Sequence, residues 1–214
     1  MESRWNLYVM ISQTPTKVGR IIRTFGRAQY NHSSLSLDPE LKNLYSFARR
    51  QYNNVMVGNL VHETIRRYTL GSVKEVPVAI FKIPVTLGQY FEVKHEITRI
   101  QNDTRYRYNF FSVISYPITG GFETDKAYSC CEFVLHILER VGVYTDKKHY
   151  NFRPDDFSEM LKDYLYYEGN LLDYVPDDIE DPDFFAPFSR GILKDTAVTF
   201  VELTRRMFTH KARR

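Results

Sequence analysis

The stretch YSCCEFVLHILERVG, residues 128–142, decides how this chain is interpreted, because it is the most regular helical pattern in the sequence. Small or apolar side chains recur along one helical face from Cys130 to Val141, at the spacing i, i+3, i+4, i+7, i+8 and i+11. Gly142 then ends the pattern. We therefore expect an amphipathic helix with Cys130 in its first turn, on the edge that faces the core.

The position of Cys130 gives it candidate chemistry. The first turn of a helix has amides without intrahelical partners and the positive end of the helix dipole. Both stabilise a thiolate and lower a cysteine pKa below its free value of about 8.5, and the same amides could hold an oxyanion. Cys131 points about 100° away around the helix. Cys130 is thus the candidate nucleophile, with the alternative that it is a small buried hydrophobe.

A nucleophilic thiol needs a base, and His32 has the most suitable setting. It begins the alternating segment from His32 to Asp38, which predicts a strand. Its neighbours Asn31, Ser33 and Ser34 are polar, so we expect the ring at a sheet edge that opens to a cleft. His32 is the candidate general base, and a solvated histidine is the alternative.

Further patterns indicate the fold class. Apolar residues alternate in three other stretches, which predicts strands. Apolar residues recur at helical spacing after Thr14, after Thr86 and near the C-terminus, which predicts helices. Strands come early and helices late, which favours an α+β fold with an antiparallel sheet packed against the cysteine-bearing helix and additional C-terminal helices. The predicted strands cover residues 5–11, 43–49 and 77–85, and the predicted helices include 14–26 and 192–207.

Composition excludes several classes of protein. The chain has 214 residues with 29 basic and 26 acidic side chains, and its longest apolar runs are far shorter than the roughly 20 residues of a membrane span. Adjacent cysteines do not staple a fold, so we expect one soluble, cytoplasmic domain. No zinc-ligand spacing occurs, and we expect no metal, no cofactor and no nucleic-acid partner. The predicted helix at 14–26 has a basic face, which is interpreted as solvated, with an anionic substrate as the lesser alternative: Lys17, Arg20, Arg23 and Arg27.

The cysteine segment also resembles a known family. Residues 128–134 look like the cysteine-helix motif of the circularly permuted NlpC-type papain-like hydrolases, the branch of the YiiX-like proteins and, more distantly, lecithin–retinol acyltransferase. In that motif the catalytic cysteine precedes an aromatic or aliphatic residue and valine by three positions. Phe133-Val134 places it at Cys130. Residues 30–38 resemble the strand that carries the family's base, at His32, and residues 45–49 and 153–157 are similar to two further elements.

The resemblance implies a single permuted papain-like domain over 1–214, with a core at about 5–165 and a C-terminal helical extension at about 166–214. It also implies a third polar residue that orients the histidine. Ser46 is the nearest candidate on the matching strand, and Glu63 and Glu132 remain alternatives.

The implied activity is that of a thiol hydrolase, a papain-like cysteine peptidase or amidase. A Cys130–His32 pair would cleave a peptide or peptide-like amide through a thioester. The alternatives are a lipid-directed thiol acyltransferase or hydrolase, and a non-catalytic binding protein that retains the fold. The expected partner is a peptide-like or lipid-like acyl substrate, and the oligomeric state is left open.

Overall fold

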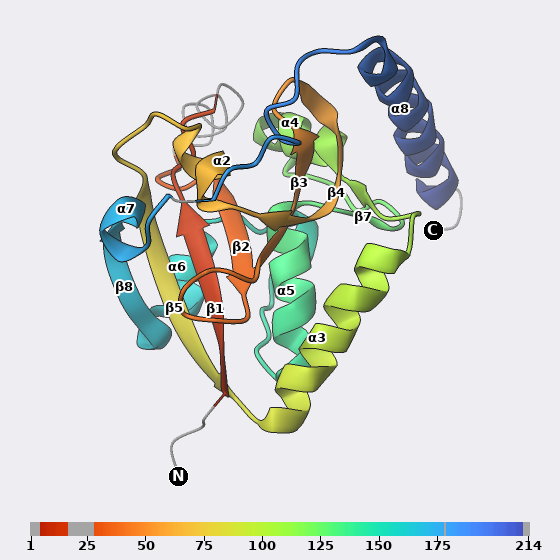
Figure 1. Cartoon of the computed structure of the whole chain (residues 1–214). Coiled ribbons are helices and arrows are strands. Elements are labelled where there is room, and N and C mark those ends of the chain that lie inside the picture. The colour runs from red at the N-terminus through yellow and green to blue at the C-terminus, as the bar shows by residue number, and fades with distance from the viewer. Residues whose placement is uncertain (1–4, 17–27, 178, 212–214) are drawn as a thin grey trace.

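The computed structural model describes residues 5–16, 28–177 and 179–211 and has a six-stranded sheet at its centre (Figure 1). Every pair of neighbouring strands is antiparallel, in the order β4-β3-β2-β1-β5-β8. The predicted α+β class with an antiparallel sheet is therefore confirmed. The strands are β1 (Trp5–Ser12), β2 (His32–Ser36), β3 (Leu44–Gln51), β4 (Asn54–Glu63), β5 (Pro77–Val85) and β8 (Leu165–Asn170).

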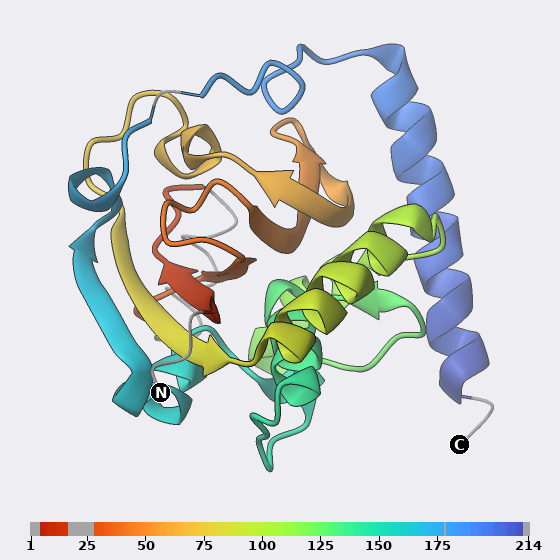
Figure 2. The same cartoon turned by 60° about the horizontal axis from the view of Figure 1, so that its bottom comes forward.

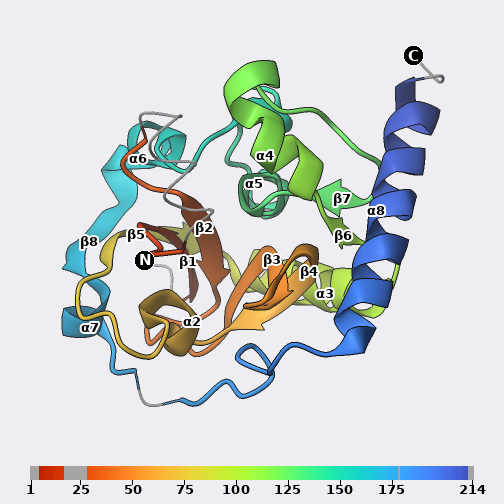
Figure 3. The same ribbon diagram turned by 90° about the horizontal axis from the view of Figure 1, so that it is seen from above.

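Helices cover both faces of this sheet. The longer α5 and α3 lie on one face, as the view from above shows, and the short α2 and α7 lie on the other (Figure 3). A separate parallel pair, β6 (Arg107–Tyr108) and β7 (Ala127–Tyr128), leads into α5. The α-helices are α2 (Ile65–Thr69), α3 (Leu87–Asn102), α4 (Phe110–Thr119), α5 (Cys130–Arg140), α6 (Asp156–Met160), α7 (Leu171–Tyr174) and α8 (Arg190–Lys211).

The central strand β1 is buried on both sides, which the alternating pattern did not predict. Leu7 and Val9 belong to the core beneath α5, as expected from the period of two. Tyr8 and Met10 point the other way and pack in a second core, beneath α2 and α7. The sheet is thus packed on both faces where β1 ends and β2 begins, which is the location of the candidate site.

The cysteine helix forms as predicted. Ser129 caps it: its hydroxyl accepts the Glu132 amide at 3.2 Å, and the Glu132 carboxylate accepts the Ser129 amide at 2.7 Å. Phe133, Val134, Ile137 and Leu138 on its apolar face are fully buried against the sheet. The predicted packing of the sheet against the cysteine-bearing helix is therefore seen, with Cys130 as the first helical residue.

The C-terminal region differs from the expectation. The supposed helical extension from residue 166 begins inside β8, which pairs with β5 and forms an edge of the sheet. Leucine and two tyrosines, at 165–167, suit an extended edge better than a helix. The predicted helix near the C-terminus is α8, which lies at the periphery, where Glu202 pairs with Arg107 of β6 (Figure 2). Within the described ranges, no helix combines the length and apolar character needed to cross a membrane.

The predicted helix at 14–26 lies mostly outside the described residues. The structure describes the chain up to residue 16 and again from residue 28. The basic face proposed for Lys17, Arg20, Arg23 and Arg27 falls entirely within the part that is not described.

Candidate active site

His32 is held at the start of β2 by a clamp on the preceding residue. The Asn31 side chain donates to the Thr14 carbonyl at 3.0 Å and accepts the Thr14 amide at 2.9 Å. In the ladder, His32 is paired with Ser12, the last residue of β1. The ring therefore leaves the sheet at a fixed point on its edge.

Cys130 meets this ring from the N-terminus of α5. The Cys130 thiol and the His32 ring are 98 residues apart in the sequence but close enough in the fold for each to shift the pKa of the other. The sulfur is nearly enclosed, since Cys130 is 8% exposed. The structure thus brings together the two residues chosen from the sequence as nucleophile and base. The neighbouring Cys131 thiol accepts a hydrogen bond from the Ser33 hydroxyl at 3.5 Å.

Glu63, the last residue of β4, contacts the other side of the ring. His32 Nε2 lies 3.1 Å from both carboxylate oxygens of Glu63. Two hydroxyls hold the same carboxylate, those of Ser34 at 2.8 Å and Tyr68 at 2.5 Å. Because Nε2 is engaged by Glu63, Nδ1 is the nitrogen available to the Cys130 thiol. The site is therefore a chain of thiol, imidazole and buried carboxylate.

The three residues considered for orienting the histidine now have distinct roles. Ser46 is buried, and its hydroxyl has no hydrogen-bond partner among the described residues. Glu132 is used by the capping box of α5. Only Glu63 contacts the ring, so the favoured candidate, Ser46, gives way to one of the two open alternatives. A carboxylate is also the better partner, since it stabilises an imidazolium that a serine hydroxyl would leave unpaired.

The charges of the site depend on each other. Burial lowers the pKa of His32, but the Glu63 carboxylate and the contact with Cys130 raise it to about 10. Burial raises the pKa of Glu63, and the His32 charge and hydrogen bond lower it to about 2. At neutral pH the histidine and the glutamate are therefore both ionised.

The pKa values of the two neighbouring thiols are shifted in opposite directions. The pKa of Cys130 is held well below its usual range, first by a hydrogen bond from Cys131, then by the hydrogen bond and charge of His32. The pKa of Cys131 is raised well above its usual range by burial and by its neighbour Cys130. Cys130 is thus the thiolate of the pair, and Cys131 stays protonated.

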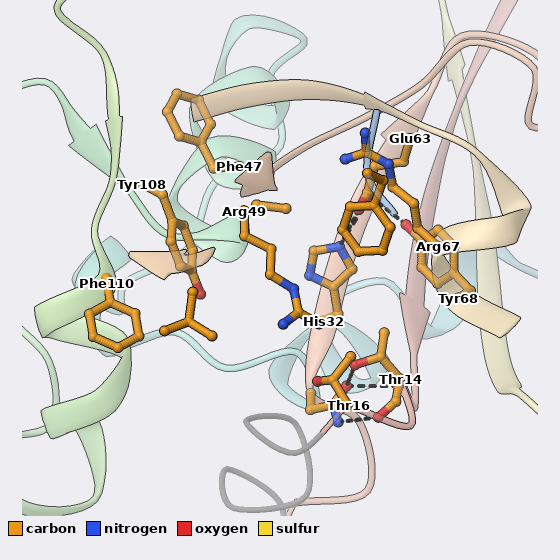
Figure 4. A pocket seen from close by; sticks show the side chains of 14 residues that line it. Thr14, Thr16, His32, Phe47, Arg49, Glu63, Arg67, Tyr68, Tyr108 and Phe110 are labelled. Atoms are coloured by element: carbon orange, nitrogen blue, oxygen red, sulfur yellow. Dashed lines mark hydrogen bonds and ion pairs between the residues drawn. The ribbon is translucent and has the colours of Figure 1, made fainter. Parts of the chain in front are cut away.

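Two cavities flank the site, and both are lined by Asn31. The first, of about 100 Å³, contains His32 and Glu63 in its wall and is partly polar (Figure 4). The second, of about 70 Å³, contains Cys130 and is mostly apolar. The thiol and the ring therefore stand where two differently lined spaces meet.

Three contributors to the site were missed in the sequence, namely Ser34, Tyr68 and Arg49. Ser34 was recoverable, because it follows His32 by two positions and shares its face of the strand. Tyr68 carries no comparable signal, since it depends on the turn between β4 and α2. Arg49 lines the first cavity from β3.

The arrangement is suited to acyl transfer through a covalent intermediate, for which a thiolate, a proton carrier and an orienting group are sufficient. Comparisons with protein-family models, with curated proteins and with solved structures find no match to this chain.

Proposed function

We propose that this protein is a thiol hydrolase that cleaves an amide bond with Cys130 as nucleophile and His32 as general acid and base. One observation carries the proposal. The thiol at the N-terminus of a capped helix lies close enough to the His32 ring for the two to shift each other's pKa, and Nε2 of that ring lies 3.1 Å from the buried Glu63 carboxylate. A solvated histidine or a packing cysteine does not require this chain of three polar groups.

In the proposed reaction the Cys130 thiolate adds to the substrate carbonyl carbon, forming a C–S bond and an oxyanion. The first-turn amides of α5, which lack intrahelical partners, stabilise that oxyanion. Its collapse breaks the C–N bond, and the leaving nitrogen takes the proton from the His32 imidazolium. Water then attacks the thioester while His32 accepts its proton. The acid is released and the Cys130 thiolate is restored, so atoms and charge balance.

Glu63 is a positioning residue in this scheme. It holds the ring orientation through two oxygens and stabilises the imidazolium before and after each proton transfer. The order of histidine before cysteine in the chain, and the sheet packed on the cysteine helix, support our assignment to a circularly permuted papain-like fold of the NlpC type. That assignment remains part of the proposal.

The apolar cavity beside Cys130 favours a second candidate, a lipid-directed thiol acyltransferase or hydrolase. Its lining includes Val113, Pro117 and Phe152, which would accept an alkyl chain. The chemistry is the same up to the thioester, and an acceptor amine would take the place of water in the transfer reaction. Incubating the protein with matched short-peptide and acyl-chain substrates, with and without an added amine, separates the two by their products.

The pH dependence of alkylation tests the proposed function. The rate at which iodoacetamide labels Cys130, followed by peptide mass spectrometry, should change little between pH 6 and pH 8. A free thiol with a pKa near 8.5 gains roughly 50- to 100-fold in thiolate over the same range. His32→Ala should restore the steep profile. Cys131→Ala removes the hydrogen bond that comes first in lowering the pKa of Cys130 but leaves the imidazolium, so its profile should lie between the two.

Two results would overturn the proposal. If wild-type Cys130 is labelled with the steep profile and rate of glutathione, the non-catalytic binding protein is the better description. If Cys130→Ala retains turnover of a substrate and Cys131→Ala loses it, the nucleophile is the neighbouring residue. The adjacent cysteines are matched controls, since both are buried in the first turn of α5.

A further inference from the structure

The cavity on the His32 side contains an arginine that pairs with no acidic side chain among the described residues. Arg49 extends from β3 into this cavity and lies between His32 and Tyr108 (Figure 4). Its guanidinium donates to the Tyr52 carbonyl at 3.0 Å and lies 4.8 Å from the centroid of the Tyr52 ring. These contacts fix the direction of the Arg49 side chain but do not neutralise the charge of its guanidinium.

A second arginine in the same wall shows the contrast. The Nε of Arg67 lies 2.6 Å from the Asp181 carboxylate, so its charge is balanced. Within the described part of the chain, no acidic side chain lies within 4 Å of the Arg49 guanidinium. Glu63 lines the cavity too, but its charge is matched by His32. The cavity therefore has a net positive charge, located at Arg49.

A partly buried, unpaired guanidinium is costly for a fold to retain. Burial, followed in this direction by the like charge of Arg67, lowers the pKa of Arg49. The hydroxyl of Tyr108 faces the same space and has no hydrogen-bond partner in the ranges that the structure describes. An anion placed between the two groups would satisfy both.

The position of this cavity indicates which half of a substrate it receives. In acyl transfer His32 must protonate the leaving atom, so the leaving group lies on the side of the histidine. The Arg49 cavity contains His32 and not Cys130, whereas the apolar cavity contains Cys130 and not His32. The acyl part therefore fits the apolar side and the leaving group fits the Arg49 side.

We propose that Arg49, with the Tyr108 hydroxyl beside it, is an anion-binding subsite for the leaving group. The substrate class is then an amide or ester that joins an apolar acyl group to an amine or alcohol carrying a carboxylate or a phosphate. Both anions match the planar donors of a guanidinium. The proposal rests on the thiol hydrolase function and specifies its substrate. Arg49 acts in it as a specificity-determining residue.

Three alkylating probes with one reactive group test the subsite. They are iodoacetyl-glycinamide, which is neutral, iodoacetyl-glycine, which carries a carboxylate, and iodoacetyl-aminoethyl phosphate. In the wild type we expect at least one anionic probe to label Cys130 about tenfold faster than the neutral probe, the value of one charged hydrogen bond. The faster of the two anionic probes identifies the anion that the site prefers.

Substitutions then assign the effect to the residue. Arg49→Gln should bring the anionic-to-neutral ratio close to one. The ratio compares two probes on the same variant, so a general change in thiol reactivity cancels, and a cooperative urea unfolding transition shows that the variant is folded. Arg49→Lys should keep part of the ratio. Arg50→Gln is the matched control, because Arg50 is exposed, does not line the cavity and removes the same charge. It should leave the ratio unaltered.

The outcomes distinguish a failure of the anion subsite from a failure of the thiol hydrolase function on which it rests. If the neutral probe labels Cys130 with the steep pH profile of a free thiol, the thiol hydrolase function fails. If the profile is flat but the ratio in the wild type is one, the anion subsite is wrong and the thiolate stands. If Arg50→Gln lowers the ratio as much as Arg49→Gln, the effect comes from overall charge and the subsite is again refuted.

Discussion

In the part of the chain that the structure describes, two buried glutamates each contact a histidine, and one of these pairs adjoins the Cys130 thiol. Glu63 is 5% exposed and lies 3.1 Å from His32. Glu96 is 3% exposed and lies 2.6 Å from His136, on the same helix as Cys130. The residue types and contacts are alike, so the difference between the two sites must come from their surroundings.

The surroundings differ in the cations available to the carboxylate. Glu96 also pairs with Arg99 at 2.7 Å and Arg140 at 3.0 Å, both of which are always charged. The remaining hydrogen-bond partners of Glu63 are the hydroxyls of Ser34 and Tyr68, which are neutral. In the described residues, His32 is the only cationic partner within 4 Å of Glu63. A carboxylate with no other cation keeps a proton on its histidine, and that imidazolium keeps the thiol ionised.

The largest expected effect therefore comes from Glu63→Gln. The amide keeps the size of the side chain but removes the charge that holds the His32 pKa at about 10. We expect turnover to fall about 10²-fold, within the range of general acid–base catalysis, and the flat alkylation profile of Cys130 to become steep. The measurement is iodoacetamide labelling from pH 6 to pH 8, together with kcat on a cleaved substrate.

Glu96→Gln is the matched control for that change. It removes an equally buried carboxylate that also contacts a histidine, at the other site. Its labelling profile should be that of the wild type. Equal loss of thiol reactivity in both variants would show that general destabilisation, and not the His32–Glu63 pair, explains the result.

The next largest expected effect is a difference between the His32–Glu63 and His136–Glu96 pairs in how their contribution to the free energy of unfolding depends on pH. The pKa of His32 is raised from 6.5 to about 10, so its contribution is complete below pH 6.5 and disappears as the pH rises through 10. The pKa of Glu63 is lowered from 4.5 to about 2, so its contribution is complete above pH 4.5. The destabilisation caused by Glu63→Gln should thus be greatest between these limits, at about 3 kcal/mol.

The corresponding loss for Glu96→Gln should persist at high pH. The pKa of Glu96 is lowered to about 2, first by the hydrogen bond from Arg99, which stays charged in alkali. Urea unfolding of both variants at pH 6 and at about pH 9.5 measures the difference. If the two variants lose their effect together as the pH rises, the histidine charge does not distinguish the sites.

Much of the fold was predictable because its signals are local. The capping box at Ser129 and Glu132 and the apolar face of α5 are both encoded within 15 residues, and both are present in the structure. The strand at Pro77–Val85 coincides with its predicted bounds. The edge strand β8 was not predicted, because an extended edge depends on pairing with β5, which lies about 85 residues earlier in the chain.

The residues of the candidate site also differ in how far local sequence predicts them. Cys130 and His32 could be chosen from their own neighbours in the sequence, a helix start and a polar strand start. Glu63 could only be left among three candidates, because its contact with His32 depends on how β4 ends and on where Tyr68 lies after the turn. Arg49 could not be selected from the sequence, because only the fold shows that no acidic side chain of the described residues lies beside its guanidinium.

The smallest expected effect comes from removing one tyrosine hydroxyl near each of the two glutamate–histidine pairs. Tyr68→Phe removes the 2.5 Å hydrogen bond to Glu63 and leaves the ring in its buried place. A hydrogen bond to a charged group contributes about 1.5–3 kcal/mol. The pKa of Glu63 should therefore rise, and the protonated form of His32 should become less stable. Because His32 and Ser34 still hold the carboxylate, we expect Cys130 labelling at pH 8 to fall only a few-fold.

Tyr106→Phe is the counterpart at the second pair. The Tyr106 hydroxyl accepts a hydrogen bond from Arg99, and the arginine has two further bonds to Glu96. Both tyrosines are buried, so the two variants share the loss of a hydroxyl inside the protein. Labelling of Cys130 should respond only to Tyr68→Phe, since only Tyr68 acts on the carboxylate that charges His32. A response to Tyr106→Phe of equal size would mean that the thiol responds to the stability of the core and not to the His32–Glu63 pair.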